Sequence, residues 1–393
     1  MIISFIRPYE NKTRTFGKDK VHIYTDYDRT LSPAVTSDAK KPKGSAILKK
    51  VAKSFEEFST LMQTMKDHIT THVSSGRSIA EYENMYILYG KRNIELPKVD
   101  SIIVKEGSDE YFENKAQNGG FSYTIKNKNR YEKLKQQTKW DNQTIREKTH
   151  RLIRQNGLTT LECKTTLSKK NYGKRSVFSR PSLLKPNTVL IRDIGDMRLF
   201  LGMPPSIPEH KAEQTALQVA DYLHSQKIKF ELVKKPKDKE CNDFLSYTFT
   251  PILKGEVLSK AYDPNLQIQK AKKEGDLVIV AGDGKNDLEM LNPLSYISKK
   301  TKNLDISDPQ RVKEFLDKQP DLKEKIKKLP LISIIVQKKD EKCQELENLN
   351  AIFGQDSEYK KIITIEEGSL AKGIKQAIKE YQKQNKKFKL KLI

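Results

Sequence analysis

The sequence predicts an α/β protein in which a Rossmann-like parallel sheet is interrupted by an inserted α+β domain. A β-branched and aromatic run at Val21–Thr25 is followed by a helical pattern from Ser45 to about residue 67 and by a second apolar run at Ile69–Ser74. A strand, a helix and a strand in that order form a unit whose right-handed crossover makes the strands parallel. Because this alternation returns late in the chain, we expect the sheet to be built from both ends of the sequence.

Helical and strand patterns in the first and last thirds of the chain support a sheet built from both ends. From Ser45 the apolar residues recur at spacings of three and four, which is typical of an amphipathic helix. In the last third of the chain the same criteria predict a helix, three strands and a final helix, in the order Asn265–Lys273, Leu277–Ala281, Leu331–Val336, Lys361–Ile365 and Ser369–Lys383.

The middle of the chain has a different pattern. A lysine-rich polar segment at Leu167–Lys185 precedes a strand at Thr188–Arg192 and a long helix at Ile207–Gln226. We therefore expect three parts: a first part of the sheet domain at 1–115, an inserted domain at 116–250, and the second part of the sheet domain at 251–393, with a charged helical insertion at about 298–329.

Length and composition fit a folded protein of two such domains. The chain has 393 residues, of which 36% are hydrophobic and 32% charged. No run approaches the ~18 apolar residues that cross a bilayer, and the apolar start of the chain is too short for a signal peptide. We expect a cytoplasmic protein without a membrane span, and export by a route that needs no signal peptide stays open.

The formal net charge of +23 is the unusual global property. A positive field attracts nucleic acid, anionic membranes and phosphorylated substrates alike. Most of the basic residues are lysine, whereas sites that read bases or grip phosphate in two places favour arginine. A lysine-rich solvated surface is therefore the simpler interpretation, and nucleic acid is not the expected partner.

Two aspartates follow the first predicted strand. Asp26 and Asp28 leave the carboxyl edge of the sheet, where open α/β folds place their ligands. Two acidic residues at this spacing also occur in solvated turns and helix caps. The pair indicates a site only if other segments support it.

Two further segments lie at predicted strand ends. Ser75-Gly76-Arg77 follows the second strand, where a hydroxyl and backbone amides could hold phosphate oxygens. Gly282–Asp287 follows the strongest strand signal in the chain and places the carboxylates of Asp283 and Asp287 four residues apart. Hard oxygen ligands without histidine or cysteine favour Mg²⁺ as the bound cation.

Together, and in this order, the three segments resemble the signature of the haloacid dehalogenase superfamily. Ser75–Arg77 and Gly282–Asp287 are similar to the Cof-type and sucrose-phosphatase-like members, and the segment from Asp26 to Pro33 is also similar to trehalose-phosphate phosphatases. Ile102–Tyr111 is similar to the hairpin that precedes the cap in sucrose phosphatases, and Trp140-Asp141 to an early cap helix. The resemblance implies a large α/β cap, which matches the insertion at 116–250.

The resemblance also implies a reaction. Asp26 would be the nucleophile that forms an aspartyl-phosphate, and Asp28 would protonate the leaving alcohol and then deprotonate water. Ser75 and Gly76 would hold phosphate oxygens, and Thr30 would stabilise the loop. Mg²⁺ would be bound by the side chains of Asp26 and Asp283 and by the backbone carbonyl of Asp28. Asp287 would either bind the cation through a water molecule or orient Asn286.

Members of the superfamily also have a lysine that binds the phosphate group and stabilises its charge in the transition state, and this sequence offers two candidates. Lys260 precedes Asp283 at the distance typical of Cof-type relatives, whereas Lys254-Gly255 looks more like the family's Lys-Gly pair. We favour Lys260 because loop lengths vary easily. Arg29 stands where many relatives have glycine, and it either contacts substrate or faces solvent. Arg192, Asp193, Asp196 and Arg198 could contact the leaving group of a substrate, but a salt-bridge cluster at a strand edge is the simpler interpretation.

Three functions follow from these observations. The first is Mg²⁺-dependent hydrolysis of a small phosphorylated metabolite, above all a sugar phosphate, because a large cap would exclude bulky substrates. The second is a phosphatase acting on phosphoprotein or another macromolecule, such as a bacterial effector, which the basic surface favours. The third is a binding protein that keeps the fold without turnover.

Overall fold

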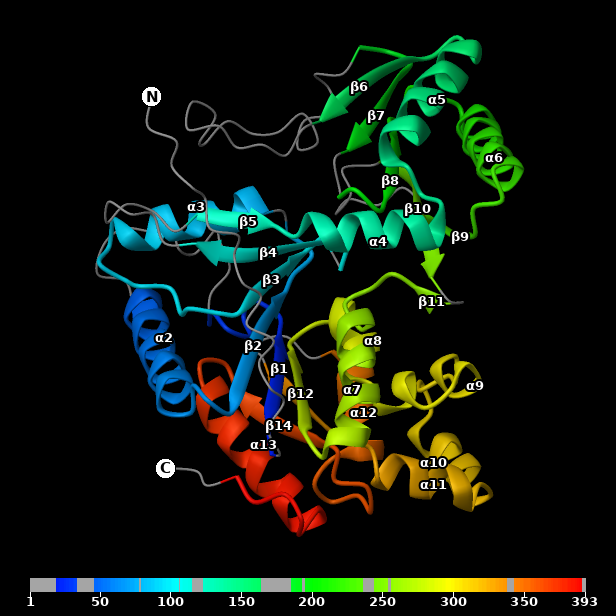
Figure 1. Ribbon diagram of the computed structural model, residues 1–393. Helices are drawn as coiled ribbons and strands as arrows, with labels where there is room; N and C mark the ends of the chain where they lie inside the picture. Colours follow the sequence, from blue (N-terminus) through cyan, green and yellow to red (C-terminus); the bar gives the residue numbers. More distant parts are fainter. Residues whose placement is uncertain are drawn as a thin grey trace.

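The computed structural model describes residues 19–33, 46–77, 79–105, 107–114, 123–163, 185–192, 195–235, 244–253, 256–337 and 343–390. These residues form two sheets, a main sheet of eight strands and a second sheet of six (Figure 1). The predicted fold class, a parallel α/β sheet accompanied by an α+β unit, is confirmed.

The main sheet is assembled from both ends of the chain, as expected. The strand order is β14 (Ile362–Glu366), β13 (Leu331–Gln337), β12 (Leu277–Gly282), β1 (Val21–Thr25), β2 (Ile69–Ser74), β3 (Ser101–Val104), β4 (Asp109–Asn114) and β5 (Tyr123–Lys126). Neighbouring strands are parallel from β14 to β3, whereas β4 pairs antiparallel with both β3 and β5.

The central strands are apolar throughout because helices cover both faces of the sheet. Successive side chains of β12 alternate between two cores: Leu277 and Ile279 belong to one, and Val278 and Val280 to the other. The first core is closed by α2 (Ala46–Thr64), α3 (Ile79–Gly90) and α13 (Leu370–Gln384). The second is closed by α7 (Tyr262–Glu274), α8 (Leu288–Leu291), α10 (Pro309–Asp317), α11 (Pro320–Lys327) and α12 (Gln344–Phe353).

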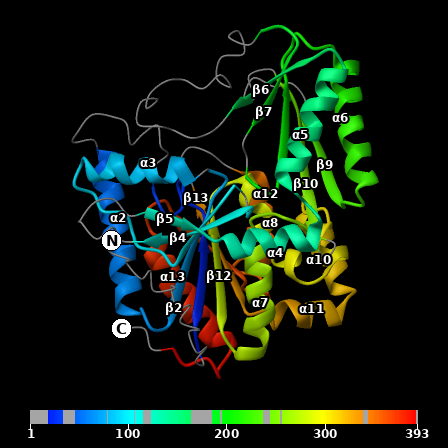
Figure 2. The same cartoon turned by 45° about the horizontal axis from the view of Figure 1, so that its top comes forward.

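The second sheet has its own core, formed against two helices that cover one face (Figure 2). These helices are α5 (Asn142–Gln155) and α6 (Glu209–Ser225). The strand order is β11 (Glu256–Val257), β10 (Leu245–Leu253), β8 (Leu199–Met203), β7 (Thr188–Arg192) and β6 (Thr159–Cys163), with β9 (Phe230–Lys235) paired to β10. The helix α4 (Lys128–Thr138) leads from β5 toward this sheet and contacts both β4 and β10.

Most predicted elements match the structure, and the two sheets do not divide at residues 116 and 250. The strands Val21–Thr25, Ile69–Ser74 and Thr188–Arg192 are confirmed. However, β5 lies within 116–250 and yet extends the main sheet by pairing with β4, while β10 and β11 carry the second sheet past residue 250. The short, half-polar strand Tyr123–Lys126 has no pattern that would assign it to either sheet. The division into domains itself stays a prediction.

The helical insertion expected at 298–329 is present as α9 (Lys299–Lys302), α10 and α11. Its apolar residues Val312, Leu316 and Ile326 are buried in the second core of the main sheet. Among the helices described, none combines the length and apolarity that a bilayer span requires.

Lys361 is an ammonium group enclosed in the main-sheet domain with 0% exposure. Its Nζ donates to the carbonyl of Leu329 at 2.9 Å and to Oε1 of Gln384 at 3.0 Å. Burial lowers the pKa of Lys361 to about 7, which the charge of Glu380 only partly offsets. Neutral oxygens therefore take the place that a carboxylate would fill beside a buried cation.

This lysine gives the stability of the protein a predictable pH dependence. Between about pH 7 and pH 10 the unfolded chain binds the proton more tightly than the folded protein, so stability rises with pH across that window. Below it the full cost of the buried charge is present. The wild type should therefore gain about 2 kcal/mol relative to Lys361→Met between pH 7 and pH 9 in urea unfolding. Lys372→Met, on an exposed position of α13, should keep a constant difference from the wild type.

Candidate active site

Three neighbouring strands of the main sheet end at the residues that the sequence singles out. Asp26 follows β1, Ser75 follows β2, and Asp283 follows β12. Since β12, β1 and β2 are adjacent and parallel, their carboxyl ends meet at one edge. The Asp26 amide donates to the carbonyl of Ala281 at 2.9 Å, which ties the first of these ends to the third.

At this edge Lys260 joins two aspartates in a buried cluster. Its Nζ donates to Oδ1 of Asp26 at 2.8 Å and to Oδ1 of Asp287 at 2.7 Å. Lys260 is 4% exposed and Asp26 5% exposed, so water screens these charges weakly. Lys260 lies in the segment between β11 and α7, where the chain returns from the second sheet to the main sheet. The other lysine considered, Lys254, lies outside the described residues.

The cluster contains more negative than positive charge. Burial, together with the charge of Asp287, raises the pKa of Asp26 to about 8 against the opposing effect of Lys260. Burial alone would lower the pKa of Lys260, but Asp26 and Asp287 raise it above its ordinary value. One ammonium group therefore does not balance three buried carboxylates, and a further cation would stabilise their ionised forms.

The donor set fits such a cation. One carboxylate oxygen from each of Asp26, Asp283 and Asp287 lies within 4.8 Å of the other two. Three hard oxygen donors without histidine or cysteine suit Mg²⁺, which commonly binds through a few carboxylates and completes its shell with water and phosphate oxygens.

The loop after β12 is shaped by close backbone contacts. Oδ2 of Asp287 accepts the amide hydrogens of Asp283 and Gly284, both at 3.2 Å, which folds the loop back on itself. A Cβ at Gly282 would lie 2.5 Å from the Cβ of Asp287, so only glycine allows this approach. The close approach of Asp287 therefore requires glycine at position 282.

The supporting residues divide into two groups. Thr30 donates to Oδ1 of Asp283 at 3.3 Å, which ties the loop after β1 to the loop after β12. Ser75 is buried, and its Oγ accepts the amide hydrogen of Arg77 at 3.2 Å. Gly76 and Asn286 are exposed at the surface beside these loops. The structure thus brings Thr30 and Ser75 into the interior of the site region, while Asn286 has no buried role within the described residues.

Asp28 has a partner that sequence reasoning missed. Its Oδ2 accepts a hydrogen bond from Nε of Arg77, whereas its carboxylate does not belong to the group of Asp26, Asp283 and Asp287. Arg77 follows directly after Ser75-Gly76, so its place in that segment was the available signal. The second aspartate is therefore held from the loop after β2.

Several arginines and acids outside the cluster have structural explanations. Arg29 has φ +58°, a left-handed conformation that glycine adopts more easily. Asp196 pairs with Lys126 of β5, and Arg198 donates to the carbonyl of Leu258 at 2.9 Å. Arg192 accepts through its carbonyl from Arg146 at 3.1 Å. Asp193 lies outside the described residues.

Comparisons with known proteins give weak likenesses. No protein-family model and no curated protein match the chain. A sucrose-phosphatase from Synechocystis, solved with sucrose and phosphate, aligns over 92% of this chain and 98% of its own at 9% identity and a TM-score of 0.39. The C-terminal domain of trehalose-6-phosphate phosphatase from C. albicans aligns over 85% of this chain and 91% of its own at 14% identity and a TM-score of 0.35. We therefore base the function on the geometry of the site alone.

Proposed function

We propose that the protein is a Mg²⁺-dependent phosphomonoester hydrolase that works through an aspartyl-phosphate on Asp26. The observation that carries this proposal is the buried group of Asp26, Lys260, Asp283 and Asp287 at the carboxyl edge of the main sheet. It combines a carboxylate nucleophile, a fixed ammonium group and a cation-binding set of oxygens, which are the parts that phosphoryl transfer requires.

In the first half of the reaction an oxygen of Asp26 attacks phosphorus, and the bond from phosphorus to the leaving oxygen breaks. Asp28 donates a proton to that oxygen, so the product leaves as a neutral alcohol. Lys260, held against Asp26, offsets the negative charge of the phosphoryl oxygens. Mg²⁺, when bound by Asp26, Asp283 and Asp287, would supply further charge neutralisation and orientation.

In the second half a water molecule gives a proton to Asp28 and attacks the phosphorus of the aspartyl-phosphate. Inorganic phosphate leaves and the Asp26 carboxylate is restored, so both residues return to their starting states. Arg77, whose Nε hydrogen-bonds to Oδ2 of Asp28, would hold that carboxyl group in place during these transfers. Ser75, buried at the end of β2, would bind a phosphoryl oxygen through its hydroxyl.

The substrate class that we favour is a small phosphorylated metabolite, above all a sugar phosphate. Support comes from burial: with Asp26 5% exposed and Lys260 4% exposed, a phosphate on a small flexible molecule reaches the nucleophile more readily than one on a folded protein surface. The +23 net charge, which would attract any polyanion, does not distinguish these classes.

The test is phosphate release by purified protein with Mg²⁺ from a panel of sugar phosphates, p-nitrophenyl phosphate and phosphopeptides. We expect the largest kcat/KM among the sugar phosphates. A preference of about 100-fold for phosphopeptides, roughly 2.7 kcal/mol in transition-state binding, would overturn the metabolite assignment and favour the macromolecular one. If no member of the panel releases phosphate, the hydrolase proposal fails, and a non-catalytic binding protein becomes the favoured function.

Cation binding can be measured without turnover. At about a hundredfold excess over its Kd, Mg²⁺ should stabilise the folded protein by about 2.7 kcal/mol. Asp283→Asn removes one of the three carboxylates and should abolish most of this gain in thermal or urea unfolding. Asp221→Asn, on an exposed position of α6, should retain it. Equal Mg²⁺ stabilisation of the wild type and Asp283→Asn would exclude Asp283 as a ligand.

A further inference from the structure

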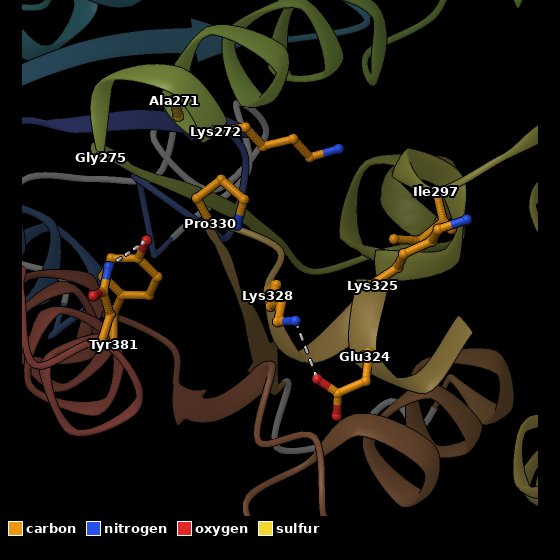
Figure 3. Close-up of a pocket in the computed structure, with 10 residues that line it drawn as sticks. Ala271, Lys272, Gly275, Ile297, Glu324, Lys325, Lys328, Pro330 and Tyr381 are labelled. Atoms are coloured by element: carbon orange, nitrogen blue, oxygen red, sulfur yellow. Dashed lines mark hydrogen bonds and ion pairs between the residues drawn. The ribbon is translucent and has the colours of Figure 1, made fainter. Parts of the chain in front are cut away.

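A cavity lies at the amino edge of the parallel strands of the main sheet, opposite the carboxyl edge that carries the aspartates. Its volume is about 580 Å³, and it opens at Pro330, directly before the first residue of β13. Asp26 and Asp283, by contrast, follow the last residues of β1 and β12. Its walls come from the last turns of α7 and α13, from α11 and from Ile297 (Figure 3). This volume is typical of small-molecule sites, and no residue of the Asp26 cluster lines it.

The inner wall of this cavity is apolar. Ala271, Pro330 and Tyr381 are buried, and Ile297 is partly buried beside them. The Tyr381 hydroxyl accepts a hydrogen bond from Nδ2 of Asn385 at 3.2 Å, so its polar end has a partner inside the protein. The cavity therefore offers a surface for an apolar molecular body.

The rim is positively charged. Figure 3 shows Lys272 approaching from α7, with Lys325 and Lys328 on the side of α11. Lys328 pairs with Glu324 at 3.4 Å. Lys272 and Lys325 have no carboxylate partner among the described residues, and burial lowers the pKa of Lys272. An anion beside these two lysines would offset a charge that the protein leaves unbalanced.

A third positive group lies behind the wall. Lys361, fully buried, donates to Leu329 and Gln384, the chain neighbours of the lining residues Pro330 and Asn385. It forms no ion pair with a carboxylate within the part of the chain described. At and below about pH 7 its ammonium form adds to the positive potential in the cavity, where the low dielectric of the surrounding protein screens it weakly.

Helix ends explain only part of this arrangement. Lysines in the last turns of α7 and α11 complement the negative ends of these helices. Lys361 also donates near helix carboxyl ends, to the carbonyl of Leu329 just past α11 and to Gln384, the last residue of α13. That effect needs no apolar cavity between the helices. The coincidence of all three features around one apolar wall indicates a ligand.

We propose that this cavity binds a small organic anion, whose carboxylate or phosphate group faces Lys272 and Lys325 and whose apolar body lies against Ile297, Pro330 and Tyr381. It is a second site, separate from the one that would hydrolyse phosphate. Its occupant differs from the favoured sugar phosphate in having an apolar body.

Ile297 provides a local reporter for the test. Phenylphosphonate and benzoate share an apolar ring and differ in the anionic group, and benzyl alcohol is the neutral control. In methyl NMR spectra, with the Ile297 signal assigned from Ile297→Val, at least one anion should shift that signal saturably, and benzyl alcohol should not. The anion that binds more tightly identifies the head group.

Charge variants complete the experiment. Lys272→Gln/Lys325→Gln should weaken the anion at least about tenfold, the factor that corresponds to ~1.4 kcal/mol. Lys49→Gln/Lys372→Gln, on exposed positions of α2 and α13 outside the cavity, should leave affinity unchanged. No saturable shift with either anion, equal binding of benzyl alcohol, or unchanged affinity in the cavity variant would each overturn the proposal. None of these outcomes depends on phosphatase activity, because the reporter lies at the opposite sheet edge.

Discussion

Asp26→Asn should lower kcat for phosphate release by about 10⁴-fold or more, the order expected when the group that forms a covalent intermediate is removed. The amide keeps the size of the carboxyl group and an oxygen that can accept from Lys260, so the architecture of the cluster survives. What it loses is the nucleophilic oxygen. Steady-state phosphate release with saturating Mg²⁺ measures the effect.

Stability should separate this loss of chemistry from a loss of structure. Burial already disfavours the charged form of Asp26, and Asp287 adds repulsion. Removing the charge should therefore leave the unfolding temperature without Mg²⁺ equal to the wild type or higher. Asp221→Asn serves as the matched control and should keep full activity. A rate for Asp26→Asn within tenfold of the wild type would assign the nucleophile elsewhere.

The position of Asp26 at the carboxyl edge of the sheet could be predicted because the buried parallel strands have a clear apolar pattern in the sequence. Val21–Thr25 and Leu277–Gly282 are apolar at nearly every position, since helices bury both faces of the sheet. Once the strand ends were fixed, Asp26 and Asp283 had to meet at one edge although they are far apart in sequence. That proximity follows from topology and needs no knowledge of side-chain conformations.

Other features depend on information that a local pattern does not contain. Spacing alone left Lys260 and Lys254 as alternatives, because the segment that carries Lys260 is positioned by β11 and α7 together. The contact between Arg77 and Asp28 depends on the conformations of two side chains on different loops. The membership of β5 in the main sheet depends on its pairing with β4, a tertiary contact.

Lys260→Met should have the second large effect, and it acts on stability as well as rate. Its ammonium group is the only positive partner that the described residues give the buried Asp26 and Asp287. Removing one partner of a buried ion pair costs about 3–5 kcal/mol, because the remaining charge is left uncompensated. Without Mg²⁺, urea unfolding should show a loss of this order, lessened where Asp26 takes up a proton.

In Lys260→Met, both kcat and the stabilisation of the folded protein by Mg²⁺ should change. Loss of a fixed donor to the transferring group lowers kcat by about 10²- to 10³-fold. Added Mg²⁺ should recover more stability in Lys260→Met than in the wild type, because the three carboxylates then face no competing ammonium group. Lys285→Met, in the same loop as Asp283 but exposed and paired with Glu345, should change neither quantity.

Lys260→Arg distinguishes charge from shape if Lys260→Met fails to fold. The guanidinium group keeps the positive charge but is larger and planar, so it should preserve stability better than methionine and still lower kcat. A fully active Lys260→Met, or one as stable as the wild type without Mg²⁺, would show that the ammonium group neither balances the aspartates nor assists the transfer. The cluster would then have to function through its carboxylates and the cation alone.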